Sequence, residues 1–182
     1  MGDLADAASH RRPHGHLVPQ SNLRRARTAV AFVFFAGGAI VGSWVARIPA
    51  VKSDLGLSDG SLGYALFGVA AGAVVAMPIA GRLSARGGSR RTTEVGLFAC
   101  CGALLLPSLA TSVMTLVPAL VVLGASIGTL DVAMNAHGLA VERAYGRPIL
   151  SSFHAAFSLG GLVGAGAAGL APTAGLDPRQ HF

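Results

Sequence analysis

Five apolar stretches, each of about 18 to 24 residues, follow one another along the chain with only short polar segments between them. An α-helix needs about 20 apolar residues to cross the hydrocarbon core of a bilayer. Only 12% of the residues are charged, whereas soluble domains carry roughly 25%. A soluble domain of 182 residues could bury one or two such helices, but not five in succession. The sequence therefore predicts an all-α, polytopic membrane bundle.

The expected membrane spans have boundaries set by apolar composition. They cover residues 28–48, 61–81, 92–109, 116–139 and 149–171. Residues 1–27 are polar and basic without apolar periodicity, which predicts a disordered cytoplasmic tail. Pro49 is expected just beyond the first span, and Ser58 is expected to cap the second.

Two residues near the outer end of the first span are expected at the membrane surface. Trp44 is typical of the aromatic belt at the interface. Arg47 is expected to extend its side chain to the headgroups, with contact to a substrate anion as the alternative.

Basic residues alternate between the two ends of the expected spans with a strong bias. Eleven fall in the tail and in the second and fourth connections: Arg11, Arg12, Arg24, Arg25, Arg27, Arg82, Arg86, Arg90, Arg91, Arg143 and Arg147. The other side has Arg47, Lys52 and Arg179. Cytoplasmic loops carry the excess of Lys and Arg, so a multi-pass cell-membrane protein with a cytoplasmic amino terminus is expected. The same bias accounts for the net charge of +6 without a nucleic-acid partner.

Recurring small residues predict that some helices approach one another closely. Gly38 with Gly42, and Gly160 with Gly164, are spaced four apart. Such spacings allow close backbone contact in membranes, but they indicate a compact bundle and nothing more specific.

The connection between the second and third spans, residues 81–91, has a recognisable pattern. It resembles the signature loop of the major facilitator superfamily (MFS), which reads Gly, three residues, an acid, Arg, any residue, Gly and two basic residues. The positions in register are Gly81, Arg86, Gly88 and Arg90. Ala85 stands where the acid is expected, and Ser89 stands where a basic residue is common. In the family this loop braces the cytoplasmic side, and the alternative is an ordinary positive-inside loop.

Further stretches strengthen the resemblance: residues 44–49, 130–136, and 151–154 followed by 158–161. They are similar to a bacterial branch of uncharacterised MFS proteins distantly related to fucose permease. The resemblance implies that residues 28–182 form part of an MFS domain in the bacterial inner membrane. It also implies secondary transport of a small solute such as a sugar, another metabolite or a drug, often coupled to protons. The family has twelve helices in two halves, so five spans suggest an amino-terminal fragment that does not transport by itself.

Asp131 is the strongest candidate for a functional side chain. It lies in the fourth expected span about eight residues from the cytoplasmic end, which is roughly 12 Å deep. A carboxylate at such depth costs about 2.5 kcal/mol or more, so it is expected to face the bundle or a water-filled cavity. Asn135 shares its helical face. Because burial disfavours the charged form, Asp131 is a candidate for proton coupling, with a structural hydrogen bond or ion pair between helices as the alternative.

His154 and Ser158 lie on one face of the fifth expected span, roughly 7 Å and 13 Å deep. They are expected to join Asp131 and Asn135 in one polar cluster if spans four and five are neighbours. The alternative is a serine bonded to its own backbone and a solvated histidine.

Other functions find little support in the residues. An intramembrane enzyme would need Ser151 and His154 as nucleophile and base, but no oxyanion glycine motif or third orienting group accompanies them. Cys100 and Cys101 are adjacent, and no metal-binding spacing of Cys or His occurs. No cofactor, metal or catalytic residue is therefore expected. The remaining alternative is a non-transporting membrane protein or an inactive transporter fragment.

Overall fold

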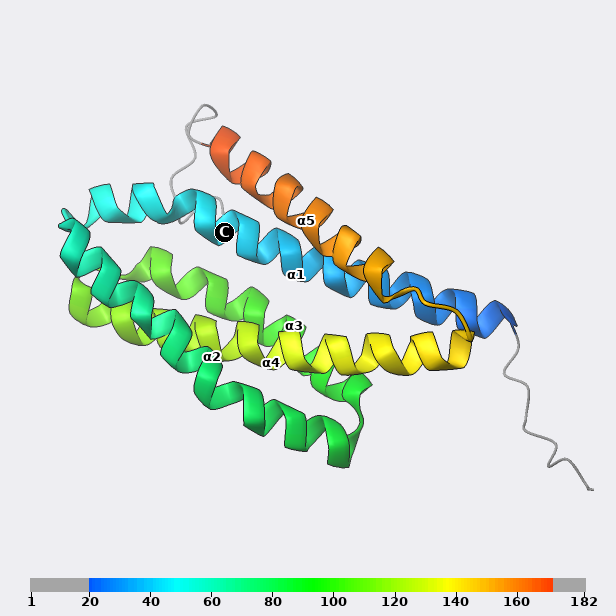
Figure 1. Cartoon of the computed structure of the whole chain (residues 1–182). Coiled ribbons are helices and arrows are strands. Elements are labelled where there is room, and N and C mark those ends of the chain that lie inside the picture. The colour runs from blue at the N-terminus through cyan, green and yellow to red at the C-terminus, as the bar shows by residue number, and fades with distance from the viewer. Residues whose placement is uncertain (1–19, 172–182) are drawn as a thin grey trace, which may run out of the picture.

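The computed structural model describes residues 20–171, all of whose regular elements are helices (Figure 1). In chain order they are α1 (Gln20–Asp54), α2 (Asp59–Gly87), α3 (Ser89–Leu105), the 3-10 helix η1 (Leu106–Leu109), α4 (Val113–Tyr145) and α5 (Leu150–Leu170). Five helices, counting α3 with η1 as one, are long and apolar enough to cross a membrane. The predicted all-α membrane bundle is thereby confirmed. The tail expected over residues 1–19 lies outside the described part.

Three helices, α1, α2 and α4, extend beyond the predicted spans at both ends, whereas α5 lies within its predicted span. Residues 20–27, which were assigned to the tail, form the start of α1, so that part of the prediction is wrong. Pro49 lies inside α1, and α4 continues through the expected polar loop to Tyr145. Apolar composition marks only the part of a helix that crosses the hydrocarbon core. In the headgroup region the helix is still stabilised by the hydrogen bonds between its own backbone N–H and C=O groups.

Local signals at the turn between α1 and α2 act as expected. The Ser58 hydroxyl accepts a hydrogen bond from the backbone N–H of Ser61 at 3.1 Å, which confirms the predicted N-cap. Lys52 and Asp59 form an ion pair that closes the same turn.

Glycines bring α1 and α5 into close contact along much of their length (Figure 1). A Cβ atom on Gly38 would lie 1.9 Å from the carbonyl oxygen of Phe157. A Cβ atom on Gly160 would lie 1.9 Å from the carbonyl oxygen of Phe35. Both distances are far below any real Cβ contact, so only glycine permits this approach. The Ser43 hydroxyl also donates a hydrogen bond across the interface, to the carbonyl of Gly164 at 3.3 Å.

A second close pair joins α2 and α4, again through small residues. A Cβ atom on Gly124 would meet the carbonyl oxygen of Val69 at 2.0 Å. By contrast, α4 and α5 make little contact, although a short turn connects them. The bundle is therefore built from two tight pairs, α1 with α5 and α2 with α4, and α3 packs chiefly on α4.

Two expectations about the outer part of α1 are wrong. Trp44 is only 4% exposed and Arg47 only 2%, so both lie inside the protein and not at the membrane surface. Trp44, Arg47 and Val51 recur on one face of α1 that turns toward the bundle. Because α1 continues to Asp54, Arg47 lies two turns before the end of the helix. Its side chain there points into the bundle.

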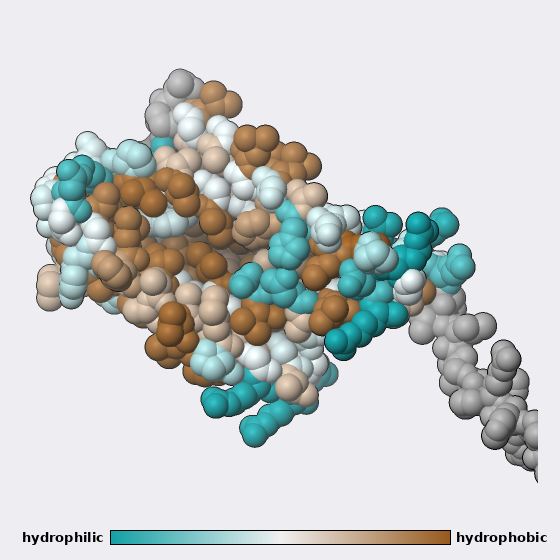
Figure 2. Space-filling model, viewed as in Figure 1, coloured by the Kyte–Doolittle hydropathy of each residue, from teal (hydrophilic) through white to brown (hydrophobic). Residues whose placement is uncertain are grey.

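The basic connections lie at one end of the bundle. Figure 1 places the start of α1 at the same end as the α2–α3 and α4–α5 turns. Arg25, Arg90 and His137 line one cleft there, although they come from three helices. Figure 2 shows hydrophilic side chains gathered mainly toward this end, with apolar residues over much of the remaining visible surface. This arrangement is the one that the expected topology requires.

Cysteine labelling in intact cells tests which side of the membrane this basic end faces. We expect a membrane-impermeant maleimide to label Ser53→Cys from outside, because Ser53 is exposed at the opposite end near the α1–α2 turn. Ser89→Cys should react only after permeabilisation, because cytoplasmic connections carry the arginines. The two changes are matched, since each replaces a hydroxyl with a thiol. The reverse labelling pattern would contradict a cytoplasmic amino terminus.

Candidate functional site

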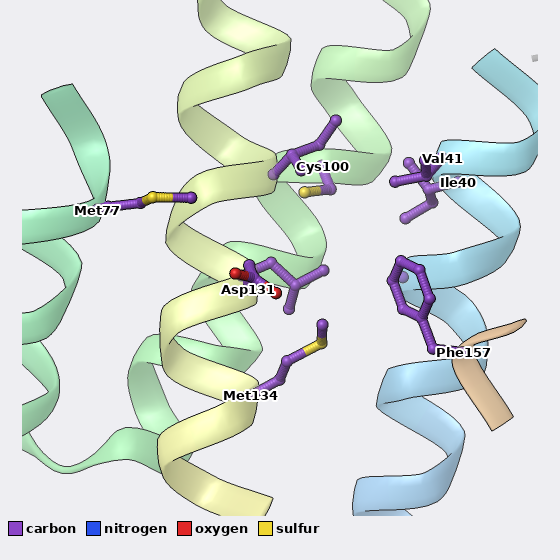
Figure 3. A pocket seen from close by; sticks show the side chains of 10 residues that line it. Ile40, Val41, Met77, Cys100, Asp131, Met134 and Phe157 are labelled. Carbon is purple, nitrogen blue, oxygen red and sulfur yellow. The ribbon is translucent and has the colours of Figure 1, made fainter. Parts of the chain in front are cut away.

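A pocket of about 170 Å³ lies where all five helices contribute side chains (Figure 3). Its lining residues are Gly37, Ile40, Val41, Met77, Cys100, Ile127, Leu130, Asp131, Met134 and Phe157. Asp131 is the only charged residue among them. We call this space the Asp131 pocket.

Asp131 lies far from both ends of α4. It lies near the middle of α4, 14 residues before Tyr145, or roughly 21 Å along the helix axis. This distance is longer than the expected 12 Å because it is measured to the end of α4, which extends beyond the predicted span. Asp131 is exposed, so it lies at the open side of the pocket and is not sealed within packed protein.

Asn135 holds the carboxylate of Asp131 from one turn away. Its Nδ2 donates to Asp131 Oδ1 at 3.1 Å and to the Asp131 carbonyl oxygen at 2.9 Å. The two ion pairs found in residues 20–171 are Lys52 with Asp59 and Arg90 with Glu94. Within that range Asp131 therefore has a neutral hydrogen-bond donor and no cationic partner. Among these residues its side-chain bond stays within α4, and the structural alternative, a hydrogen bond or ion pair between helices, is not observed there.

His154 and Ser158 lie elsewhere than expected. Neither lines the Asp131 pocket; Phe157 is the residue that α5 contributes. The Ser158 hydroxyl donates to the carbonyl of His154 at 3.1 Å, and the His154 ring meets Phe34 of α1 edge-on at 5.4 Å. This separation arises because α5 packs along α1 and makes little contact with α4. A part for His154 and Ser158 in coupling stays a prediction.

Sequence reasoning did not single out the apolar walls of the pocket. Met77, Cys100 and Phe157 come from three different helices and have no shared spacing. Only the assembled bundle brings them together around Asp131. In residues 20–171, no three His, Cys, Asp or Glu side chains are grouped so that they could hold a metal ion.

The signature turn is very short in the structure. Gly88 alone separates α2 from α3, with φ of 88°, a conformation that residues with a Cβ rarely adopt. Arg90 Nε donates to Glu94 Oε1 at 2.9 Å within α3, and Arg86 is exposed. Gly81 faces α4, where an added Cβ atom would just contact Val132. The backbone conformation therefore explains why position 88 is a glycine, whichever role the arginines play.

These features define a multi-pass helical membrane protein with a single carboxylate at the open side of an apolar pocket. Curated proteins resemble it over most of its length. An uncharacterized MFS-type transporter of Yersinia pestis is 38% identical over 152 residues, which is 84% of this chain and 40% of that protein. The uncharacterized transporter y4wD of Sinorhizobium fredii is 33% identical over 153 residues, covering 84% of this chain and 41% of its own length. Membrane protein MosC of Rhizobium meliloti is 37% identical over 137 residues, 75% of this chain and 34% of MosC.

The resemblance to the major facilitator superfamily is thereby confirmed, and the chain is homologous to MFS-type transporters over most of its residues. It spans about two fifths of the length of the first two relatives. No family profile matches the chain. No solved structure matches it either.

Proposed function

We propose that this chain forms part of a secondary transporter that moves a small solute across the cell membrane in exchange or symport with protons. Asp131 is the proton-binding group. The observation that carries the proposal is the position of this lone carboxylate in an otherwise apolar pocket lined by all five helices. Two homologues are named as transporters, and neither name denotes an enzyme.

The pocket has the chemistry that proton coupling needs. A charged carboxylate in apolar surroundings is costly, whereas its protonated form is neutral. When the pocket opens to water, the charged form is stabilised and the proton can leave. When the pocket closes, the free-energy cost of enclosing Asp131 is low only if its carboxylate has bound a proton. Asn135 can donate to the carboxyl oxygen in either state, so it orients the group throughout.

The fold also suggests how a proton and a solute could be linked. Because α1, α4 and α5 all line the pocket, a change in their relative positions alters the surroundings of Asp131. A solute in the pocket would exclude water from the same carboxyl group. Occupancy by solute and by proton would then influence each other at one site.

Uptake into proteoliposomes tests the proposal directly. The complete gene product is reconstituted, and a panel of radiolabelled sugars and amino acids is offered with an imposed pH gradient. We expect at least one solute to accumulate above equilibrium, and a protonophore to abolish that accumulation while downhill flux continues. Accumulation that survives the protonophore but needs a sodium gradient would contradict proton coupling and leave transport itself intact.

A further inference from the structure

Three arginines converge on one tyrosine at the basic end of the bundle, far from the Asp131 pocket. Arg24 and Arg27 come from the start of α1, and Arg147 comes from the α4–α5 turn. One cavity of about 240 Å³ is lined by Gln20, Leu23, Arg24, Tyr145 and Arg147. A second, of about 510 Å³, is lined by Arg24, Arg27, Thr28, Ala31 and Tyr145. The two share Arg24 and Tyr145, and we call them together the arginine pocket.

The helical geometry explains this convergence. Gln20, Arg24, Arg27 and Ala31 recur every three or four residues, so they share one face of α1. The extension of α4 to Tyr145 brings the tyrosine ring under this face, and the guanidinium of Arg27 lies 5.6 Å from the ring centroid. This cation–π contact holds Arg27 in place without neutralising its charge.

The acid nearest in sequence does not compensate these charges. Glu142 lies one turn before the end of α4, and its Oε2 accepts the backbone N–H groups of Ile149 and Leu150 at 2.7 Å each. The carboxylate is thus engaged at the start of α5. No Asp or Glu lines either cavity. Arg24 therefore shares one cavity with Arg147 and the other with Arg27, and an anion bound between such a pair would relieve their mutual repulsion.

The lining indicates which anion fits. Guanidinium groups bind phosphate oxygens through paired, charge-assisted hydrogen bonds. The pocket also has apolar walls, Leu23 and Ala31, and Ala31 belongs to the apolar part of α1 that is expected to enter the membrane. A soluble phosphate makes no apolar contact with such walls, whereas the acyl chains of a phospholipid would pack against them. Basic pockets between helices at the cytoplasmic side are suited to anionic headgroups.

We propose that the arginine pocket binds the phosphate of an anionic phospholipid, with the acyl chains lying along α1. The bound lipid bridges the start of α1 and the α4–α5 turn, which the fold otherwise joins there through the contact of Arg27 with Tyr145. The proposal is independent of proton coupling at Asp131, since the two pockets share no lining residue.

Lipid retention measured by native mass spectrometry provides the test. The complete gene product in mild detergent is titrated with phosphatidylglycerol or phosphatidylcholine. We expect phosphatidylglycerol to bind more tightly. Arg24→Gln with Arg147→Gln should weaken that binding about 25-fold, since each basic residue near an anionic membrane surface strengthens binding about fivefold. Phosphatidylcholine binding should not change. Higher salt should weaken the phosphatidylglycerol complex of the wild-type protein.

A matched variant distinguishes lipid binding at the arginine pocket from non-specific attraction to positive charge. Arg82→Gln with Arg91→Gln removes the same charge at the same end of the bundle from two exposed side chains that line neither cavity. We expect it to bind phosphatidylglycerol as the wild type does, and equal loss in both double variants would overturn the proposal. Displacement of the lipid by millimolar inorganic phosphate would show a soluble-phosphate site in place of a lipid site.

A conservative change covers the case in which the double variant does not fold. Arg147→Lys keeps the charge but removes the planar fork that pairs with phosphate oxygens. We expect weaker phosphatidylglycerol binding with an unchanged thermal unfolding temperature. Wild-type lipid binding by a folded Arg147→Lys variant would contradict the assigned role of Arg147.

Discussion

Replacing Asp131 with Asn is expected to abolish uphill accumulation of substrate while downhill exchange remains measurable. The change keeps the size of the side chain and its capacity to hydrogen-bond with Asn135. It removes the only titratable carboxyl group that lines the pocket. If Asp131 carries the coupling proton, the accumulation ratio in proteoliposomes with an imposed pH gradient should fall to equilibrium. Counterflow of labelled substrate, measured in the same vesicles, should persist.

Thr129→Val serves as the matched control for this experiment. Thr129 lies two residues before Asp131 on the same helix, and its hydroxyl donates to the carbonyl of Ala125 at 2.8 Å. The substitution removes a polar group of α4 at similar depth without touching the pocket lining. We expect accumulation close to that of the wild type. Normal proton-driven accumulation by a well-folded Asp131→Asn protein would eliminate the coupling role.

A different outcome would indicate that Asp131 is structural. In that case Asp131→Asn should lower expression or thermal stability, and flux in every assay should fall together. Trp44 is buried in the bundle, so tryptophan fluorescence of the same purified protein responds when the helices around it unfold. Unfolding followed by this fluorescence separates the two outcomes, because a coupling variant should unfold at the wild-type temperature.

Gly160→Ala is expected to destabilise the bundle strongly, although Ala is the better helix former. The new methyl group would lie 1.9 Å from the carbonyl oxygen of Phe35, a backbone atom that cannot turn aside. α1 and α5 must then separate, and the cost of such overpacking is about 1–3 kcal/mol. We expect a clear fall in the thermal unfolding temperature measured in detergent by tryptophan fluorescence.

The neighbouring glycine provides the control. A Cβ atom on Gly161 would lie 3.7 Å from the carbonyl oxygen of Gly38, which is an ordinary contact distance. Gly161→Ala should therefore unfold at the wild-type temperature or above it. Equal destabilisation by both substitutions would mean that α5 does not pack on α1 as described.

Several features could be predicted from the sequence because each depends on a short run of residues. The number of spans follows from the free energy of transferring each apolar stretch into the hydrocarbon core, which is a property of that stretch alone. The N-cap at Ser58 is formed within one helical turn. The pairing of Asp131 with Asn135 follows from a spacing of four residues on one helix.

Other features depend on which helices meet, and spacing along the chain does not contain that information. The glycines of α1 and α5 allow close packing, but they are equally compatible with other partners until the surfaces are matched in space. The actual pairing of α1 with α5 places His154 against Phe34 and leaves Phe157 beside the Asp131 pocket. The same assembly buries Arg47, whose position near a proline had indicated the membrane surface. The sequence by itself thus determined the class of protein and singled out Asp131 as the candidate carboxylate. The tertiary structure decided what surrounds that carboxylate, because the pocket walls come from five helices whose contacts are non-local.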